Sequence, residues 1–137
     1  MSSTITATDL GLDLRKADEQ TMFKWFLASY LFGKRIQQDI AKRTWEVFMH
    51  AGIDTPRKIH NRSWQELVDL LGEGHYKRYD ESTARNLLDM SQQLLDDYKG
   101  KLTTMRAAAT SKADFGKKLQ QLKGVGPKTA EIFLREL

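Results

Sequence analysis

The stretch LKGVGPKTAE, Leu122 to Glu131, sets two glycines around a valine and follows them with a proline and a lysine. Gly124 and Gly126 allow a positive φ or a close approach of another backbone, which side chains of other residues hinder. Pro127 has the fixed φ and the missing N–H that suit the first position of a helix. We therefore predict a helix, a tight turn at the glycines, and a second helix that begins at Pro127.

The backbone amides of this turn are a candidate phosphate site. The first N–H groups of a helix have no partner within the helix and lie at the positive end of its dipole, so they bind anionic oxygens. Val125 can turn inward and anchor the turn, while the amides around Gly124, Gly126 and Lys128 remain free. Lys123 and Lys128 add positive charge. Such contacts would hold a nucleic-acid backbone without reading its sequence.

The charge of the chain is concentrated around the same stretch. The 137 residues carry a net charge of +4, and residues 112–128 contain five lysines and one acid, Asp114, so this segment accounts for the whole excess. A polyanion would be attracted to it, although a lysine-rich face is also typical of a helix that is merely exposed to solvent.

The composition excludes several classes of protein. With 40% hydrophobic residues the chain is typical of a globular domain. It has neither an apolar run long enough to span a bilayer nor the layout of a secretory signal, so we expect a cytoplasmic protein without a membrane partner. The absence of cysteine excludes thiolate-bound metals and clusters, and the three histidines lack ligand spacing. We predict no metal and no cofactor.

Helical periodicity and capping signals divide the chain into elements. Residues 1–17 are predicted to be a flexible arm, and residues 18–137 a single helical domain. The predicted helices cover 18–33, 36–52, a short segment from Pro56, 63–72, 80–100, 111–122 and 127 to about the C-terminus, with a connector at 103–110. In the second helix we expect Ile36, Ile40, Val47 and Phe48 to share the buried face. No alternating β-pattern appears, so the predicted fold class is all-α.

The segment LKGVGPKTA resembles the helix-hairpin-helix motif of the endonuclease III-like DNA glycosylases, Leu-x-Gly-Val-Gly-x-Lys-Thr-Ala. The helices from about residue 20 onward are similar to those of the family in order and spacing. The resemblance implies an orthogonal multi-helix bundle of the six-helix barrel type, with the helix-hairpin-helix at residues 112–136. It also implies double-stranded DNA as the partner, base-excision repair as the process, and Thr129 as part of the DNA-binding motif.

Lys128 is the catalytic residue that the resemblance implies. It matches the lysine that attacks the sugar and forms a Schiff base in the bifunctional glycosylases, which are also abasic-site lyases. The alternative is a lysine that only neutralises a phosphate. Glu131, three positions later on the same predicted helix, is expected to form a local salt bridge with Lys128.

Two other loops correspond to segments that approach DNA in the family. Lys34 stands in the loop FGKRIQ where the family has a glutamine that fills the gap left by a flipped base, so Lys34 and Arg35 are expected to contact phosphates instead. The loop GEGHYKRYD, residues 72–80, offers Tyr76, Lys77 and Arg78 as DNA contacts, because aromatic and basic groups together can stack on bases. The alternative is that its tyrosines pack against the domain.

The chain departs from the family pattern at its end. The catalytic aspartate of the family follows the helix that begins at the hairpin, whereas this chain ends nine residues after Lys128. The resemblance therefore implies a further C-terminal domain or a protein partner. Three functions remain open: part of a DNA glycosylase or abasic-site lyase, a non-catalytic DNA-binding module, and a helical adaptor for another protein. The sequence leaves the base lesion and the oligomeric state undetermined.

Overall fold

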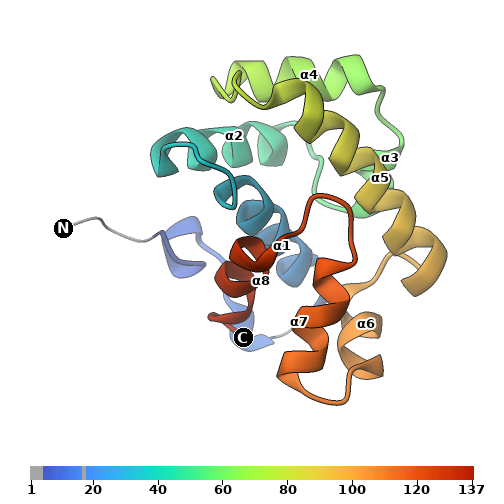
Figure 1. The fold of residues 1–137 in the computed structure, drawn as a ribbon. Helices are drawn as coiled ribbons and strands as arrows, with labels where there is room; N and C mark the ends of the chain where they lie inside the picture. The colour runs from blue at the N-terminus through green and yellow to red at the C-terminus, as the bar shows by residue number, and fades with distance from the viewer. Residues whose placement is uncertain (1–4, 17) are drawn as a thin grey trace.

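The computed structural model describes residues 5–16 and 18–137, and these residues form α-helices and 3-10 turns without any strand (Figure 1). The all-α prediction is confirmed. The elements are the 3-10 turns η1 (Thr8–Leu10) and η2 (Leu14–Lys16) and the helices α1 (Glu19–Phe32), α2 (Gln38–His50), α3 (Pro56–His60), α4 (Trp64–Glu73), α5 (Asp80–Tyr98), α6 (Leu102–Ala108), α7 (Lys112–Gln120) and α8 (Pro127–Leu134).

Helix α1 runs through the centre of the structure, and α2, α6 and α8 pack against it (Figure 1). Nine of the ten residues from Met22 to Leu31 are buried, and Lys24 is the exception. The helix is therefore buried around nearly its whole circumference, as expected for a central helix. The indole N–H of Trp25 donates a hydrogen bond of 3.1 Å to the Phe133 carbonyl and ties α1 to α8.

The predicted helix starts are confirmed where they rest on capping residues. Thr55 caps α3 ahead of Pro56, and Ser63 and Glu66 form a reciprocal capping box at α4. Ser111 caps α7 by accepting from the Asp114 amide at 3.0 Å. These signals depend on residues three apart or fewer, so the sequence alone contains them.

The prediction for the buried face of α2 holds fully only at Phe48, since Ile36 and Ile40 are partly buried against the core and Val47 is half-buried. The buried side chains are those of Ala41, Thr44, Trp45 and Phe48. Ile36 precedes the helix, and the indole of Trp45 turns inward to donate a hydrogen bond of 2.9 Å to the Lys24 carbonyl of α1. That bond supplies a partner for a buried N–H, which an aliphatic face would not need.

The predicted connector at 103–110 contains a helix, α6. Leu102 and Met105 are buried, and the Glu19 carboxylate accepts hydrogen bonds from the Leu102 and Thr103 amides at 2.9 and 2.8 Å. The cap of this helix therefore comes from α1 instead of from the preceding residue, which explains why no local signal marks its start.

The prediction of a flexible arm over residues 1–17 does not hold for its central part. Ala7 is 2% exposed and belongs to the hydrophobic core, and Leu10, Leu12 and Leu14 pack against that core. The Ile5 amide donates to Gln38 Oε1 of α2 at 3.0 Å. Residues 1–4 and 17 lie outside the described residues.

Among the helices described, none combines the length and the apolar character needed to cross a membrane.

Candidate nucleic-acid interface

The turn between α7 and α8 has the conformation that the glycines predict at Gly124. Its φ is +81°, in the left-handed region that glycine favours. A Cβ atom at this position would collide with the Tyr30 hydroxyl oxygen and would lie 2.8 Å from Tyr30 Cζ and 3.1 Å from Asn86 Cβ. Gly124 is therefore required both by the backbone conformation and by the side chains of α1 and α5 beneath the turn.

Gly126 has a different role. Its φ of −103° and ψ of −174° are open to any residue, and it is the N-cap of α8 without a side-chain cap. A Cβ atom at Gly126 would have no neighbour within 4 Å. The fold does not need a glycine here, so what the missing side chain provides is open space in front of the first turn of α8.

Three amides of the turn and of the first turn of α8 have no hydrogen-bond partner in the part of the chain that the structure describes. Among residues 5–16 and 18–137, no oxygen accepts a hydrogen bond from the amides of Gly124, Gly126 or Lys128. Val125 is 6% exposed, and its amide donates to the Leu122 carbonyl at 3.1 Å, so the valine anchors the turn as predicted. The arrangement can accept an anionic oxygen at the positive end of the α8 dipole.

Thr129 contributes only its backbone to this surface. Its side chain is buried, and a Cβ atom on Gly33 would collide with Thr129 Oγ1 and would lie 3.2 Å from Thr129 Cβ. The Thr129 side chain therefore packs inside the fold and holds the loop after α1 against α8, so its predicted place in the DNA-binding motif rests on its backbone.

The last turn of α1 holds three loops together. The Tyr30 hydroxyl donates to the Lys123 carbonyl of the glycine turn at 2.6 Å. Leu31, the residue after Tyr30 in α1, accepts a hydrogen bond of 2.7 Å at its carbonyl from the Tyr76 hydroxyl. Gly33 then meets Thr129 of α8. The loops 33–37, 74–79 and 121–126 are thus gathered at one end of one buried helix.

The predicted contacts in loop 74–79 are corrected at Tyr76. The Tyr76 side chain is fully buried, and burial is the main cause that raises the pKa of its hydroxyl above the usual value. Its ring is therefore unavailable for stacking on a base. Lys77 and Arg78 are exposed, and the Arg78 guanidinium lies 5.4 Å from the centre of the half-buried Tyr79 ring. Of the three residues predicted to contact DNA in this loop, Lys77 and Arg78 remain candidates and Tyr76 does not.

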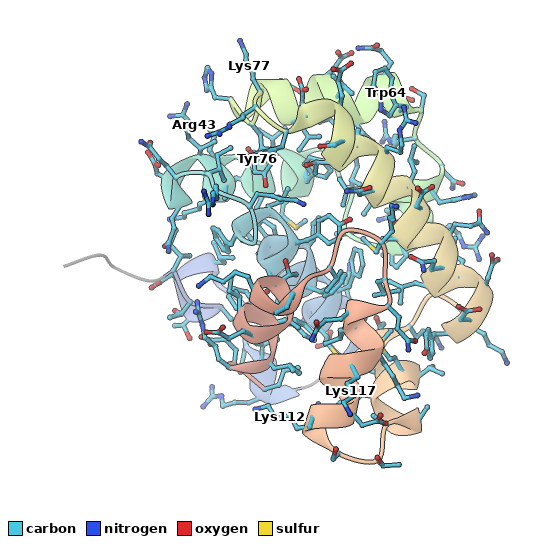
Figure 2. The ribbon with its side chains drawn as sticks, viewed as in Figure 1. Arg43, Trp64, Tyr76, Lys77, Lys112 and Lys117 are labelled. Atoms are coloured by element: carbon cyan, nitrogen blue, oxygen red, sulfur yellow. The ribbon has the colours of Figure 1, made fainter. Side chains whose placement is uncertain are left out.

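The basic residues of loop 33–37 are also placed at the surface. Arg35 is exposed and Lys34 is half-buried. The sequence prediction missed two further cations. Figure 2 shows Arg43 of α2 in the same part of the molecule as Lys77. Arg85 is exposed on α5, next to Asn86, which lies beneath Gly124. Neither arginine belongs to a motif, so only the folded chain shows their positions.

The lysines of residues 112–128 do not form a single patch. Figure 2 shows Lys112 and Lys117 at the end of the molecule away from Lys77, and the Lys112 ammonium donates to the Leu137 carbonyl at 2.9 Å. Only Lys123 and Lys128 flank the glycine turn, and both are exposed. The charge that the sequence concentrates in one segment is therefore spread from the start of α7 to the first turn of α8.

Lys128 lies on the exposed side of α8 and lines a small pocket of about 90 Å³, together with residues of α1, α2 and the N-terminal segment. The predicted salt bridge to Glu131 is absent from the ion pairs of the described residues. The ammonium group of Lys128 is thus left to solvent or to a ligand.

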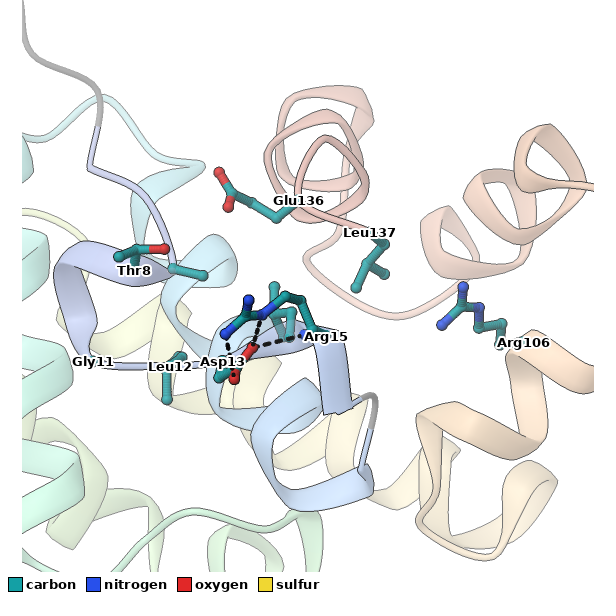
Figure 3. Close-up of a pocket in the computed structure, with 10 residues that line it drawn as sticks. Thr8, Gly11, Leu12, Asp13, Arg15, Arg106, Glu136 and Leu137 are labelled. Carbon is teal, nitrogen blue, oxygen red and sulfur yellow. Dashed lines mark hydrogen bonds and ion pairs between the residues drawn. The ribbon is translucent and has the colours of Figure 1, made fainter.

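A larger pocket, of about 630 Å³, lies away from the turn (Figure 3). It is lined by the N-terminal segment, Arg106 and the last two residues. Inside it Arg15 is paired with the Asp13 carboxylate through two side-chain hydrogen bonds of 3.0 and 3.2 Å. Because two acidic and two basic residues line it, this pocket has no single sign of charge with which to attract a polyanion.

Comparison with models of known protein families finds no match for this chain, and comparison with curated proteins finds no relative.

Proposed function

We propose that the chain binds the sugar-phosphate backbone of double-stranded DNA through the turn 121–126 and the first turn of α8. The observation that carries the proposal is the group of unpaired amides at Gly124, Gly126 and Lys128, in a turn that has open space at Gly126 and an exposed lysine on either side. An anionic oxygen is the ligand that such a group binds best.

The positions of the other cations favour a long polyanion over a small anion. Lys34, Arg35, Lys77 and Arg78 lie on the two loops that α1 gathers beside the turn. A single phosphate would use only the turn, whereas a duplex offers a row of phosphates that several loops can contact. Contacts of this kind position a protein on DNA and do not read its sequence.

The resemblance to the helix-hairpin-helix DNA glycosylases supports the same proposal. The resemblance rests on the motif from Leu122 to Ala130, and it implies the six-helix barrel arrangement of that family. Membership in that superfamily, with a role in base-excision repair, is part of what we propose. A second candidate function, cleavage at abasic sites, is favoured by the exposed Lys128 on the first turn of α8.

Salt dependence of duplex binding tests the proposal. Affinity should fall with a slope of about 0.9 in log K per log salt for each phosphate neutralised, and Lys123→Ala should reduce that slope by about 1. Lys112→Ala is the matched control, because it removes the same charge from the far end of α7. It should leave the slope nearly unchanged.

Two outcomes would contradict the proposal. One is wild-type protein without salt-linked affinity for duplex DNA, which would leave the protein-adaptor hypothesis. The other is an equal loss from the Lys112 and Lys123 variants, which would mean that net charge rather than the turn attracts DNA.

A further inference from the structure

The backbone of Lys123 is held on both sides by side chains from distant helices. Its amide donates to Gln93 Oε1 of α5 at 2.6 Å, and its carbonyl accepts from the Tyr30 hydroxyl of α1 at 2.6 Å. Gln93 also donates through Nε2 to the Gln121 carbonyl at 3.1 Å. One glutamine therefore spans the end of α7 and the start of the turn.

Neither side chain belongs to the exposed surface of the turn. Tyr30 is fully buried and Gln93 is half-buried. Burial is the main cause that raises the pKa of the Tyr30 hydroxyl far above its ordinary value, and the nearby Tyr76 and Asp89 raise it further, so the group remains a hydrogen-bond donor well above physiological pH. Tyr30 also forms the floor on which Gly124 rests.

A turn with two glycines loses much conformational entropy when it is fixed. If the fold does not already fix the turn, this entropy is lost when the ligand binds, and the affinity for the ligand is lower. The three hydrogen bonds that Tyr30 and Gln93 make with the turn add to the anchoring by Val125 and fix the turn from α1 and α5 before a ligand arrives.

We propose that Tyr30 and Gln93 are positioning residues, which hold the glycine turn in the geometry that presents its amides to a phosphate. The inference rests on the proposed function, because it assigns these two residues to the binding of the DNA backbone by that turn. They act through Lys123 and Gly124 and do not contact the ligand.

The first experiment compares two neighbouring glutamines. Gln93→Met keeps the length of the side chain and removes its hydrogen bonds to the turn. Gln92→Met is the control, because Gln92 is exposed on the same helix and its side chain donates to Asp96 Oδ1 at 2.8 Å, away from the turn. We expect Gln93→Met to weaken duplex binding about tenfold, or ~1.4 kcal/mol, and to reduce the salt slope by about 1. Gln92→Met should bind like wild type.

The salt slope separates positioning from a general loss of stability. A variant that is merely less stable keeps the slope of the wild type once only folded protein is measured, whereas a displaced turn loses a phosphate contact. Tyr30→Phe removes one hydroxyl and should change the slope in the same direction, which provides a second variant if Gln93→Met does not fold. Both proteins are first checked for cooperative unfolding.

A double-mutant cycle then tests whether Gln93 acts through the turn. If it does, Gln93→Met should cost much less affinity in a Gly126→Ala background than in wild type, because the methyl group at residue 126 already obstructs the amides that Gln93 positions. Additive losses would overturn the positioning role. So would a folded Gln93→Met variant with the affinity and slope of wild type. Absence of salt-linked binding by the wild type would instead refute the proposed function, and this inference with it.

Discussion

The glycine turn allows a sharp test, because its two glycines differ in what surrounds them. Gly124→Ala places a methyl group on a residue whose φ is +81°, directly against the Tyr30 hydroxyl. A left-handed conformation costs an alanine about 1–2 kcal/mol. The hydroxyl cannot move aside without losing its bond to the Lys123 carbonyl, which adds about 1 kcal/mol. We expect a loss of about 2–3 kcal/mol in the free energy of unfolding.

Gly126→Ala is the matched control within the same turn. Its φ of −103° suits alanine, and the new methyl group meets no atom within 4 Å. The free energy of unfolding should stay within about 0.5 kcal/mol of wild type, as for other surface substitutions. The same methyl group occupies the space before the α8 amides, so duplex affinity should fall although stability does not.

Urea denaturation followed by tryptophan fluorescence measures both variants, because Trp25 and Trp45 are buried and become exposed on unfolding. The Gly124→Ala midpoint should drop with an unchanged m-value. A Gly124→Ala protein within about 0.5 kcal/mol of wild type would refute the described turn geometry. Equal losses of stability at Gly124 and Gly126 would show that the two positions do not differ as described.

Three further predictions concern the core, the α4 cap and Lys128. Phe133 is fully buried and packs edge-on against Phe26 at 5.4 Å, so Phe133→Ala should cost about 3–5 kcal/mol of unfolding free energy, and half-buried Phe32→Ala clearly less. Hydrogen bonds from the Ser63 backbone and side chain, then from Arg62, lower the pKa of Glu66. The stability that Glu66 contributes is present above its unfolded pKa and is lost as pH falls through the lower folded pKa. Glu66→Gln should therefore flatten the fall in Tm between about pH 5 and pH 3, and an unchanged fall would contradict this reasoning. Borohydride should trap a covalent adduct between the wild type and abasic-site DNA if the chain is a lyase. Lys128→Ala should abolish that adduct, and its persistence would exclude Lys128 as the nucleophile.

Much of the secondary structure could be predicted, because the signals are local. Thr55 before Pro56, the pair Ser63 and Glu66, and Ser111 all cap helices through contacts within three residues. Helix α6 escaped prediction because its cap, Glu19, comes from 83 residues earlier in the chain. The periodicity of α2 showed its buried face only in part, since Trp45 turns toward a carbonyl on another helix and joins Phe48 in the core.

For the candidate site, the sequence by itself determined the glycine turn, its two flanking lysines and the start of α8, because backbone conformation and helix capping depend on adjacent residues. The tertiary structure decided the rest. Tyr76 and Thr129 are packing residues because the end of α1 lies against them. The turn is held at Lys123 by Gln93, which is 30 positions earlier in the chain, and by Tyr30, which is 93 positions earlier. Burial and long-range hydrogen bonds depend on which helices meet, and no spacing within a single segment records that.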